Sequence, residues 1–380
     1  MTGKSSDVVI AGGGVIGLSV AYVLAREGLR ATVLDAGPLG RAASWAGAGI
    51  VAPGAARPTD HPDAPLRTLG ARLHEEWSCA LREETGLDNG YRRCGGLDVA
   101  WTDDEAQWLR ETAPLWDEEG ITFRRLGPAE FAEVEPALSP LAQVAYFFPD
   151  RAQIRNPWHL RALESACERR GVVLRPRCPA LGFDVAAGRV RAVRTPEGPM
   201  PCDCLVVAAG PWSESLLSGL VPDVATPPIR GQIVLLRTPR PVLRRIVEHG
   251  HDYLVPRDDG RVLVGSTEEH AGFEARTTPR AVRDLIDTAL RLCPALESAE
   301  VERAWAGLRP GSHDGRPYIG PAPGLENAIV ATGHRRAGLQ LSPGTAEVVA
   351  DLILGRSPRI DLSPYRIGRE PSPVEAVFRS

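Results

Sequence analysis

The chain has 380 residues and a formal net charge of −4. That length is enough for one large domain or two interleaved domains with well-buried cores, and the small charge gives no reason to expect nucleic acid or an anionic membrane as a partner. No apolar run approaches the ~20 residues that span a bilayer, and the polar N-terminus is not a secretory signal, so we expect a cytoplasmic protein that binds no membrane.

The cysteines and the single lysine argue against disulfides, a metal site and catalysis through a lysine. The seven cysteines are an odd number and mostly isolated, which favours reduced thiols over a disulfide framework. Cys202 and Cys204 are too closely spaced for the usual zinc-binding pair and no histidine cluster accompanies them, so we expect no metal. Lys4 is the only lysine, which argues against catalysis through a lysine and leaves arginine, a planar ligand for carboxylates, as the abundant cation.

The first predicted unit is strand, tight turn, helix and strand over Asp7–Asp35, with the sequence DVVIAGGGVIGLSVAYVLAREGLRATVLD. It follows the glycine pattern of dinucleotide-binding folds: Gly12 allows the turn, Gly14 lets the backbone approach a pyrophosphate, and Gly17 lets the helix pack closely. Asp35 ends the second strand, where an acid accepts hydrogen bonds from a ribose diol. The unit predicts a cofactor that contains adenosine diphosphate, and it does not separate NAD from FAD.

Helices and strands are predicted through the rest of the chain. Gly37–Pro53 is rich in small residues and is expected to be a loop against a flat surface. Further along, periodicity and capping signals predict helices at 66–85, 103–119, 157–170, 278–292 and 338–354. Strands are predicted at 94–101, 144–148, 204–209, 229–237, 253–256, 262–265, 301–307 and 327–332.

Strands of the buried parallel type occur near the beginning, middle and end of the chain, with antiparallel-type strands between them. This order predicts an α/β fold in which a Rossmann-like cofactor-binding domain is built from discontinuous segments, with an inserted α+β substrate domain containing a mixed or antiparallel sheet. We assign the cofactor domain to 1–88, 149–222 and 310–364, the substrate domain to 89–148 and 223–309, and a tail to 365–380.

Three further segments carry the functional information: 251–265 (HDYLVPRDDGRVLVG), 305–320 (WAGLRPGSHDGRPYIG) and 333–343 (GHRRAGLQLSP). Together with the glycine unit they resemble the D-amino-acid oxidase group of flavoproteins, most closely its glycine oxidase branch. The resemblance runs from about residue 7 to residue 360, which is nearly the whole chain. It implies a two-domain α/β flavoprotein with non-covalent FAD as its cofactor.

The resemblance also implies which residues contact FAD. They belong to the pyrophosphate turn and ribose site, the loop beside the flavin, an adenine-contacting position and the stretch that wraps the flavin ring: Gly12, Gly14, Val15, Ile16, Gly17, Asp35, Ala36, Ala43, Ser44, Ala48, Gly49, Ile50, Ala180, Gly210, His334, Arg335, Arg336, Ala337, Gly338, Leu339 and Gln340. Trp45 lies in the same loop and is a further candidate. The positive end of the helix predicted at 338–354 could stabilise the anion that develops on a reduced flavin.

The same resemblance implies the substrate residues. Arg309 matches the family's carboxylate-binding arginine, Arg336 an active-site neighbour and Tyr253 the active-site tyrosine. A guanidinium fork and a phenol can hold an amino-acid carboxylate, which leaves the α-carbon facing flavin N5 for hydride transfer. The alternative is a purely structural role: a salt bridge for each arginine, and a packed core position for the tyrosine. His251 matches a histidine near the same pocket, and for it a structural role is favoured.

The chain departs from the family pattern at three positions. Glu268 stands where glycine oxidases carry an apolar side chain in the substrate pocket, Arg335 replaces an aromatic residue, and Ala337 replaces an asparagine. A carboxylate at Glu268 could favour a substrate with a second positive charge. It could equally pair with Arg335 or Arg336 and be neutral in effect.

The resemblance implies the FAD-dependent oxidative deamination of glycine or a related small amino acid. Hydride passes from the α-carbon to flavin N5, the imine hydrolyses to an oxo acid and ammonia, and molecular oxygen is reduced to hydrogen peroxide, with a role in thiamine biosynthesis. One alternative is a dehydrogenase of amino acids or N-methyl amino acids that uses a quinone-type acceptor. Another is a flavin-binding protein without turnover. A homo-oligomer is left open.

Overall fold

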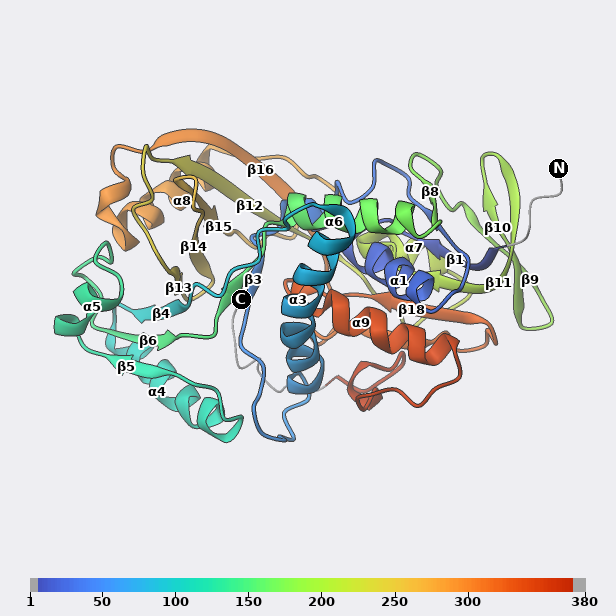
Figure 1. Cartoon of the computed structure of the whole chain (residues 1–380), viewed down its shortest axis with the longest axis horizontal. Coiled ribbons are helices and arrows are strands. Elements are labelled where there is room, and N and C mark those ends of the chain that lie inside the picture. Colours follow the sequence, from blue (N-terminus) through green and yellow to red (C-terminus); the bar gives the residue numbers. More distant parts are fainter. Residues whose placement is uncertain (1–5, 372–380) are drawn as a thin grey trace.

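The structure is a computed structural model that describes residues 6–371, and it has two lobes side by side along its long axis (Figure 1). Each lobe contains an eight-stranded sheet, and a two-stranded sheet of β3 (Ile50–Val51) and β7 (Ala152–Gln153) joins segments about a hundred residues apart. The long helix α3 (Ala64–Thr85) stands near the junction of the lobes (Figure 1).

The first sheet is mainly parallel. Strands β8, β2, β1, β11 and β18 run parallel in that order, β17 pairs antiparallel with β18, and β9 and β10 extend β11 as an antiparallel ribbon. Their bounds are β1 (Ser6–Ala11), β2 (Ala31–Leu34), β8 (Val173–Arg175), β9 (Gly182–Ala186), β10 (Arg189–Thr195), β11 (Gly198–Val207), β17 (Tyr318–Pro321) and β18 (Ala328–Thr332).

Helices cover one face of this sheet. They are α1 (Val15–Arg26), α6 (Asn156–Arg169) and α9 (Gly338–Ile353), which pack on one another and on α3. Val8 and Ile10 of β1 belong to the core under these helices, whereas Val9 and Ala11 belong to the core on the opposite face. Both faces are therefore buried, which is why this strand is a continuous apolar run instead of an alternating one.

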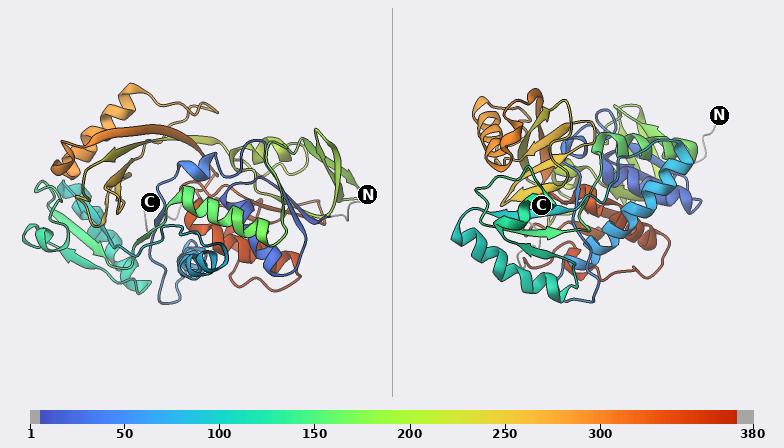
Figure 2. Two further views of the ribbon diagram at one scale, coloured as in Figure 1. Left: turned by 45° about the horizontal axis from the view of Figure 1, so that its top comes forward. Right: turned by 60° about the vertical axis from the view of Figure 1, so that its left-hand side comes forward.

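The second sheet is mixed and mostly antiparallel. Its order is β16-β12-β15-β14-β13-β4-β6-β5, with β13 and β4 as a parallel pair. Its bounds are β4 (Gly96–Ala100), β5 (Arg124–Leu126), β6 (Val144–Phe148), β12 (Pro228–Arg237), β13 (Ile246–His249), β14 (Asp252–Pro256), β15 (Arg261–Gly265) and β16 (Glu300–Pro310). Figure 2 shows it as a curved layer. The helix α8 (Pro279–Leu292) and the short α5 (Pro128–Val134) pack on the face that carries Leu97 and Val99 of β4, whereas α4 (Asp103–Glu118) packs on the opposite face with Ala100 of the same strand.

The α/β class with a mixed second sheet is confirmed, and so are the predicted helices. The helices expected at 66–85, 103–119, 157–170, 278–292 and 338–354 are α3, α4, α6, α8 and α9, each within two residues at both ends. Every strand of the first sheet falls within 1–88, 149–222 and 310–364, and the strands of the second within 89–148 and 223–309 apart from Pro310. On this distribution we propose the two domains.

Two local predictions differ from the structure. Gly37–Pro53 is not wholly a loop, because it contains the one-turn helix α2 (Ala43–Ala46) and strand β3. In the predicted tail at 365–380, Tyr365 is buried and its hydroxyl donates to the carbonyl of Pro62 at 2.7 Å. Arg369 is also buried and pairs with Asp314 at 2.7 Å, so the part described here packs on the first lobe, while 372–380 lie outside the described residues.

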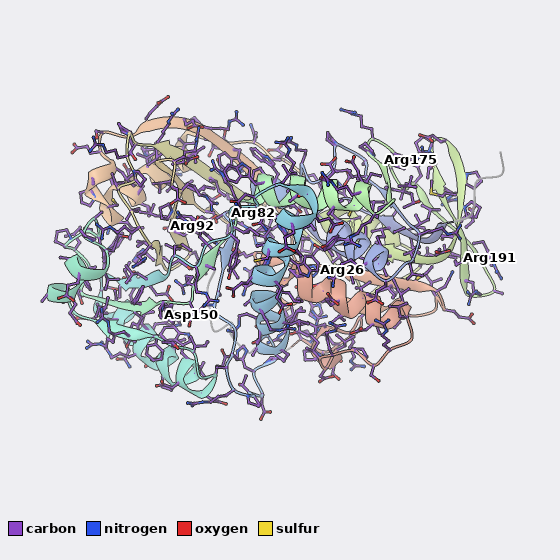
Figure 3. All side chains as sticks on the ribbon, viewed as in Figure 1. Arg26, Arg82, Arg92, Asp150, Arg175 and Arg191 are labelled. Atoms are coloured by element: carbon purple, nitrogen blue, oxygen red, sulfur yellow. The ribbon has the colours of Figure 1, made fainter. Side chains whose placement is uncertain are left out.

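Charged side chains, most of the cations being arginines, spread over both lobes, as the labelled arginines of Figure 3 illustrate. Between residues 6 and 371 no helix is long and apolar enough to cross a bilayer. In the same residues, no three His, Cys, Asp or Glu side chains are grouped so that they could hold a metal ion.

Candidate active site

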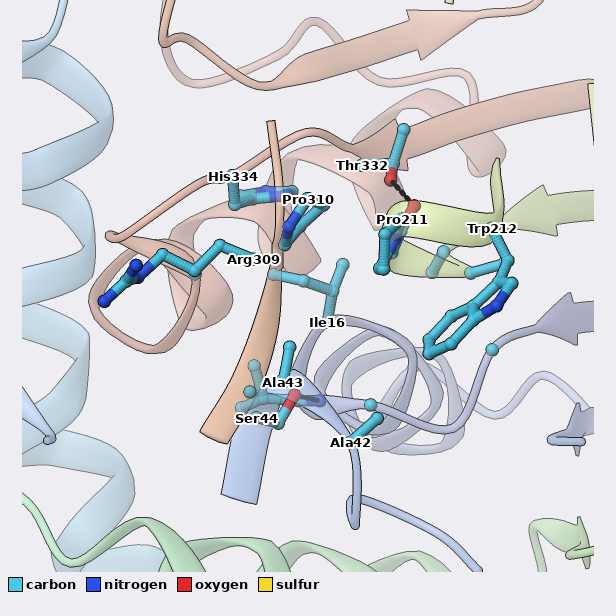
Figure 4. Close-up of a pocket in the computed structure, with 18 of the residues that line it drawn as sticks. Ile16, Ala42, Ala43, Ser44, Pro211, Trp212, Arg309, Pro310, Thr332 and His334 are labelled. Carbon is cyan, nitrogen blue, oxygen red and sulfur yellow. Dashed lines mark hydrogen bonds between the residues drawn. The ribbon is translucent and has the colours of Figure 1, made fainter. Parts of the chain in front are cut away.

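A cavity of about 1150 Å³ lies where the two sheets meet (Figure 4). One wall is built from the turns that follow β1, β2, β11 and β18, at the carboxyl ends of the parallel strands. The other wall is a face of the second sheet, to which β12, β14 and β16 contribute. A crevice outside the carboxyl ends of parallel strands is the usual ligand site of open α/β sheets.

The turn after β1 has no room for side chains. A Cβ on Gly12, whose φ is +116°, would lie 2.2 Å from the carbonyl oxygen of Ala208, and one on Gly17 would lie 1.8 Å from that of Gly12. Gly14 is the N-cap of α1, and Val15 at the first helical position donates its backbone N–H to Ser44 Oγ at 2.9 Å. The N-terminus of α1 therefore borders the cavity with bare backbone, as binding of a phosphate requires.

Asp35 is fixed at the end of β2. Its two oxygens accept the backbone N–H groups of Gly13 at 2.8 Å and of Gly37 at 2.7 Å. Burial raises the pKa of this carboxyl, and the two hydrogen bonds oppose that effect. A carboxylate oxygen has lone pairs left after one such bond, so Asp35 can also accept ribose hydroxyls.

These features fit the adenosine diphosphate part of FAD: a glycine turn, a helix N-terminus and a fixed acid line one cavity. Gly49 also lines the cavity; its φ is +80° and a Cβ would lie 2.0 Å from the carbonyl oxygen of Ile154, so glycine lets this loop pack closely on the segment before α6.

The turn between β18 and α9 forms the next part of the wall. His334 is buried and its Nε2 lies 3.0 Å from Thr345 Oγ1, and burial lowers its pKa to about 3, so the ring is neutral. Gln340 donates its amide to the carbonyl of Ala52 at 3.1 Å, which fixes the first turn of α9 against the chain after β3. The N-terminus of α9 is thereby held beside the cavity.

Arg309 of β16 is the best-defined cation of the site. Its Nη2 donates to Ser266 Oγ at 2.6 Å and its Nη1 to the carbonyl of Thr267 at 3.1 Å. Within residues 6–371 no carboxylate lies within 4.0 Å of this guanidinium, and burial lowers its pKa from the usual arginine value. It is a positive charge held by neutral oxygens, which leaves it available for an anion.

Two glycines set the positions of the guanidinium and of the neighbouring phenol. A Cβ on Gly231 of β12 would lie 2.3 Å from Arg309 Nη2, and one on Gly265 would lie 2.5 Å from the hydroxyl oxygen of Tyr253. Both side chains therefore lie flat on a strand, at places where only hydrogen on Cα leaves space.

A charged cluster borders the same end of the cavity. Arg335 donates to Glu268 Oε1 at 2.5 Å, Arg336 Nε lies 3.5 Å from Glu268 Oε2, and Arg336 Nη1 donates to His251 Nδ1 at 3.1 Å. Burial would raise the pKa of Glu268, but the hydrogen bond from Arg335 and the charges of Arg335, Arg336 and Arg309 outweigh it and hold the pKa below its usual value. Of the two possibilities raised by the sequence, pairing with the arginines is the one found.

Nearly all the residues expected in the site line this one cavity, which also includes Tyr253, Arg309, Arg335 and Arg336. The exceptions are Gly17, Glu268 and His251. Gly17 packs α1 against the turn. Glu268 accepts a hydrogen bond from Arg335, and His251 accepts one from Arg336. Trp45 is not among the lining residues, because its ring packs on Trp305 at 5.4 Å.

The structure adds lining residues that no motif had indicated. Ser266 supplies a hydroxyl to Arg309, and Gly231 supplies the floor beneath it. Trp212 lines the far part of the cavity (Figure 4) and stacks on Phe273, with ring centroids 5.7 Å apart. An isolated glycine inside a predicted strand is the signal that could have indicated Gly231, since it marks a close approach to the backbone.

Replacing Gly231 by alanine tests whether the close contact of its Cα with Arg309 positions the guanidinium. The added methyl would displace the guanidinium of Arg309, so we expect KM for the amino-acid substrate to rise about 10-fold or more, the cost of one misplaced charge-assisted hydrogen bond, with flavin content unchanged. Steady-state kinetics and the flavin-to-protein absorbance ratio measure both. An unchanged KM would show that Arg309 does not need its present position.

Comparison with known proteins agrees with this geometry. The chain is 38% identical to glycine oxidase of Pseudomonas putida over 95% of its own length and 98% of that protein. It is 34% identical to the bifunctional protein ThiO/ThiG of Synechocystis, over 95% of this chain and 54% of that one. The structure of glycine oxidase from Geobacillus kaustophilus superposes with a TM-score of 0.92 at 31% identity, covering 97% of this chain and all of the other. The family model of DAO, FAD dependent oxidoreductase, matches residues 7–352, and the chain belongs to that family.

Proposed function

We propose that this protein oxidises glycine or a related small amino acid with non-covalently bound FAD. The observation that carries the proposal is Arg309, a partly buried guanidinium that lines the cavity, is held by Ser266 and Thr267, and has no carboxylate within 4.0 Å among residues 6–371. A cation built into a site without a counter-ion is suited to an anionic ligand. The glycine oxidase relatives support an amino-acid carboxylate as that ligand.

In this proposal Arg309 binds the substrate carboxylate through the two ends of its guanidinium fork, and the hydroxyl of Tyr253 supplies a second hydrogen bond. Tyr253 is suited to this role because its hydroxyl lies over Gly265 and, within the described residues, has no hydrogen-bond partner. When bound, FAD would accept hydride from the α-carbon and pass the electrons to molecular oxygen. The released imine then hydrolyses to the oxo acid and ammonia.

The chain's own residues position the substrate and do not have to remove a proton from carbon. His334 is neutral, buried and engaged with Thr345, so it is unsuited to act as a base. A substrate that arrives with a neutral amine needs no base at all. What the site must supply is orientation, which a two-point anchor on the carboxylate gives.

Purification tests the proposal directly. We expect a yellow protein whose FAD is released by denaturation, which shows non-covalent binding, and whose flavin absorbance is bleached by glycine without oxygen. A protein that cannot be reconstituted with FAD, or whose flavin stays oxidised with every amino acid tried, would defeat it. One peroxide formed per substrate consumed marks an oxidase; a yield near zero with a quinone-type acceptor active would mark a dehydrogenase. A cytoplasmic location and a role in thiamine biosynthesis belong to the same proposal, the latter supported by the bifunctional relative.

A further inference from the structure

The pairing of β12 with the chain after β15 contains an irregularity. β12 pairs with β15 as far as Ile233 opposite Gly265. Further along, Arg230 pairs with Glu269 in an isolated bridge. Between these two pairs β12 has two residues and the other segment has three, so residues 266–268 form a β-bulge. A bulge interrupts the regular ladder and re-aims the groups of the strand that carries it.

The bulge changes which group of Thr267 completes the ladder. Hydrogen-bonded pairs recur every two residues in a regular antiparallel ladder, so Gln232 would donate its N–H to the carbonyl of Thr267. Here that N–H donates to the Thr267 hydroxyl at 3.0 Å. The carbonyl accepts from Arg309 Nη1 at 3.1 Å, and Ser266 of the same bulge accepts from Nη2 at 2.6 Å. The bulge therefore supplies two acceptors for the guanidinium.

Glu269 fixes the orientation of the Thr267 hydroxyl. The hydroxyl donates its one hydrogen to Glu269 Oε1 at 2.6 Å, which leaves its lone pairs for the N–H of Gln232. Glu269 Oε1 also accepts the side-chain amide of Gln232 at 2.7 Å, and Oε2 accepts from Arg230 at 2.5 Å. Burial would raise the pKa of Glu269, but hydrogen bonds from Arg230, Thr267 and Gln232 outweigh it and hold the pKa below its usual value. The carboxylate is therefore a charged, fixed acceptor at neutral pH.

This network lies outside the cavity. Gly231 lines the cavity, and its neighbours Arg230 and Gln232 point to the opposite face of the sheet because side chains alternate along a strand. Thr267 and Glu269 are also absent from the lining residues. A ligand in the cavity can respond to these side chains only through the groups that the bulge presents to it.

We infer that Thr267 and Glu269 are positioning residues for carboxylate binding and act through Arg309. Glu269 orients the Thr267 hydroxyl, the hydroxyl takes the ladder bond, and the carbonyl that is released holds the guanidinium in place. This rests on the proposed function, in which Arg309 binds the substrate carboxylate. What position 267 requires is a hydroxyl, because valine has the shape of threonine but cannot accept the N–H of Gln232.

Calorimetric titration of the FAD-loaded protein with acetate, a carboxylate without an amine, tests the inference without turnover. We expect the Kd of acetate to rise about 10-fold in Thr267→Val, since one of the two hydrogen bonds that hold the guanidinium is misplaced, with FAD content unchanged. Thr267→Ser keeps the hydroxyl and should recover most of that affinity. Glu269→Ala removes the acceptor of the hydroxyl and should also weaken acetate binding.

Thr238, just after β12, provides the matched control. It is buried, its hydroxyl donates to the carbonyl of Arg240 at 2.7 Å, and it is not a lining residue, so Thr238→Val makes the same change away from the cavity. Its thermal midpoint should fall as in Thr267→Val, but its Kd for acetate should stay within about twofold of the unmodified protein. Equal losses of acetate affinity in the two valine variants would overturn the inference.

Arg309→Met separates this inference from the proposed function. If acetate binding is lost in Arg309→Met but is unchanged in Thr267→Val or in Glu269→Ala, the inference is wrong and the proposed function stands. If acetate binds equally well to Arg309→Met, carboxylate binding by Arg309 is contradicted, and the inference falls with it.

Discussion

Replacing Arg309 by methionine should lower kcat/KM for the amino-acid substrate by about 10²- to 10⁴-fold. The estimate follows from two charge-assisted hydrogen bonds to the carboxylate at about 1.5–3 kcal/mol each, with every 1.36 kcal/mol worth a factor of ten. The FAD content should stay the same, because the hydrogen bonds of Arg309 go to Ser266 and Thr267 and not to the glycine turn or Asp35. Steady-state kinetics with the flavin absorbance ratio of the purified variant gives both quantities.

The same strand offers a matched control. Arg303 is an exposed arginine of β16, so Arg303→Met removes the same charge and adds the same side chain outside the cavity. Its kcat/KM should be within about twofold of the unmodified protein, as for ordinary surface substitutions. A loss of activity as large in Arg303→Met as in Arg309→Met would show that the effect is general charge and not carboxylate binding.

Gly17→Ala should yield protein without bound FAD. A Cβ at this position would lie 1.8 Å from the carbonyl oxygen of Gly12, so α1 must move away from the turn that borders the pyrophosphate site. The free energy of unfolding should fall by about 1–3 kcal/mol, the usual cost of forcing a methyl into filled space. The flavin absorbance ratio and the thermal midpoint with and without added FAD measure the two effects.

Gly28, which follows the C-terminal end of α1, provides a control substitution at a glycine that has open space around it. Its φ is +84° and a Cβ would meet nothing within 4 Å, so Gly28→Asn should keep FAD and lose little stability, since asparagine tolerates this conformation. Retention of FAD by Gly17→Ala to the level of Gly28→Asn would contradict the role assigned to close packing of α1.

The sequence was most informative where function rests on local chain geometry. The turn at Gly12 and the helix after it involve neighbours in sequence, and a glycine pattern records them directly. Arg309 and Tyr253 are different: their isolated residue types say little, and a resemblance spread over distant segments indicated them. The structure brings them to one cavity wall, on β16 and β14, although their roles stay predictions.

What the sequence missed depends on contacts between distant segments. Strand β3 is two residues long and exists because it pairs with β7, a hundred residues later, so no local pattern predicts it. The segment after 364 reads as a polar tail, but Tyr365 and Arg369 anchor it through Pro62 and Asp314. Whether Glu268 would face the substrate or the arginines was likewise undecidable, because it depends on where three loops meet.

If the Arg309 guanidinium selects substrates by their carboxylate, an amine without that group must react slowly. The most direct measurement is anaerobic, single-turnover reduction of the flavin followed by stopped-flow absorbance, with glycine compared with methylamine, which is the same amine without the carboxylate. We expect glycine to bleach the flavin in the unmodified protein, methylamine to be at least about 10²-fold slower at equal concentration, and the difference to collapse in Arg309→Met. Equal rates for the two amines in the unmodified protein would contradict the account.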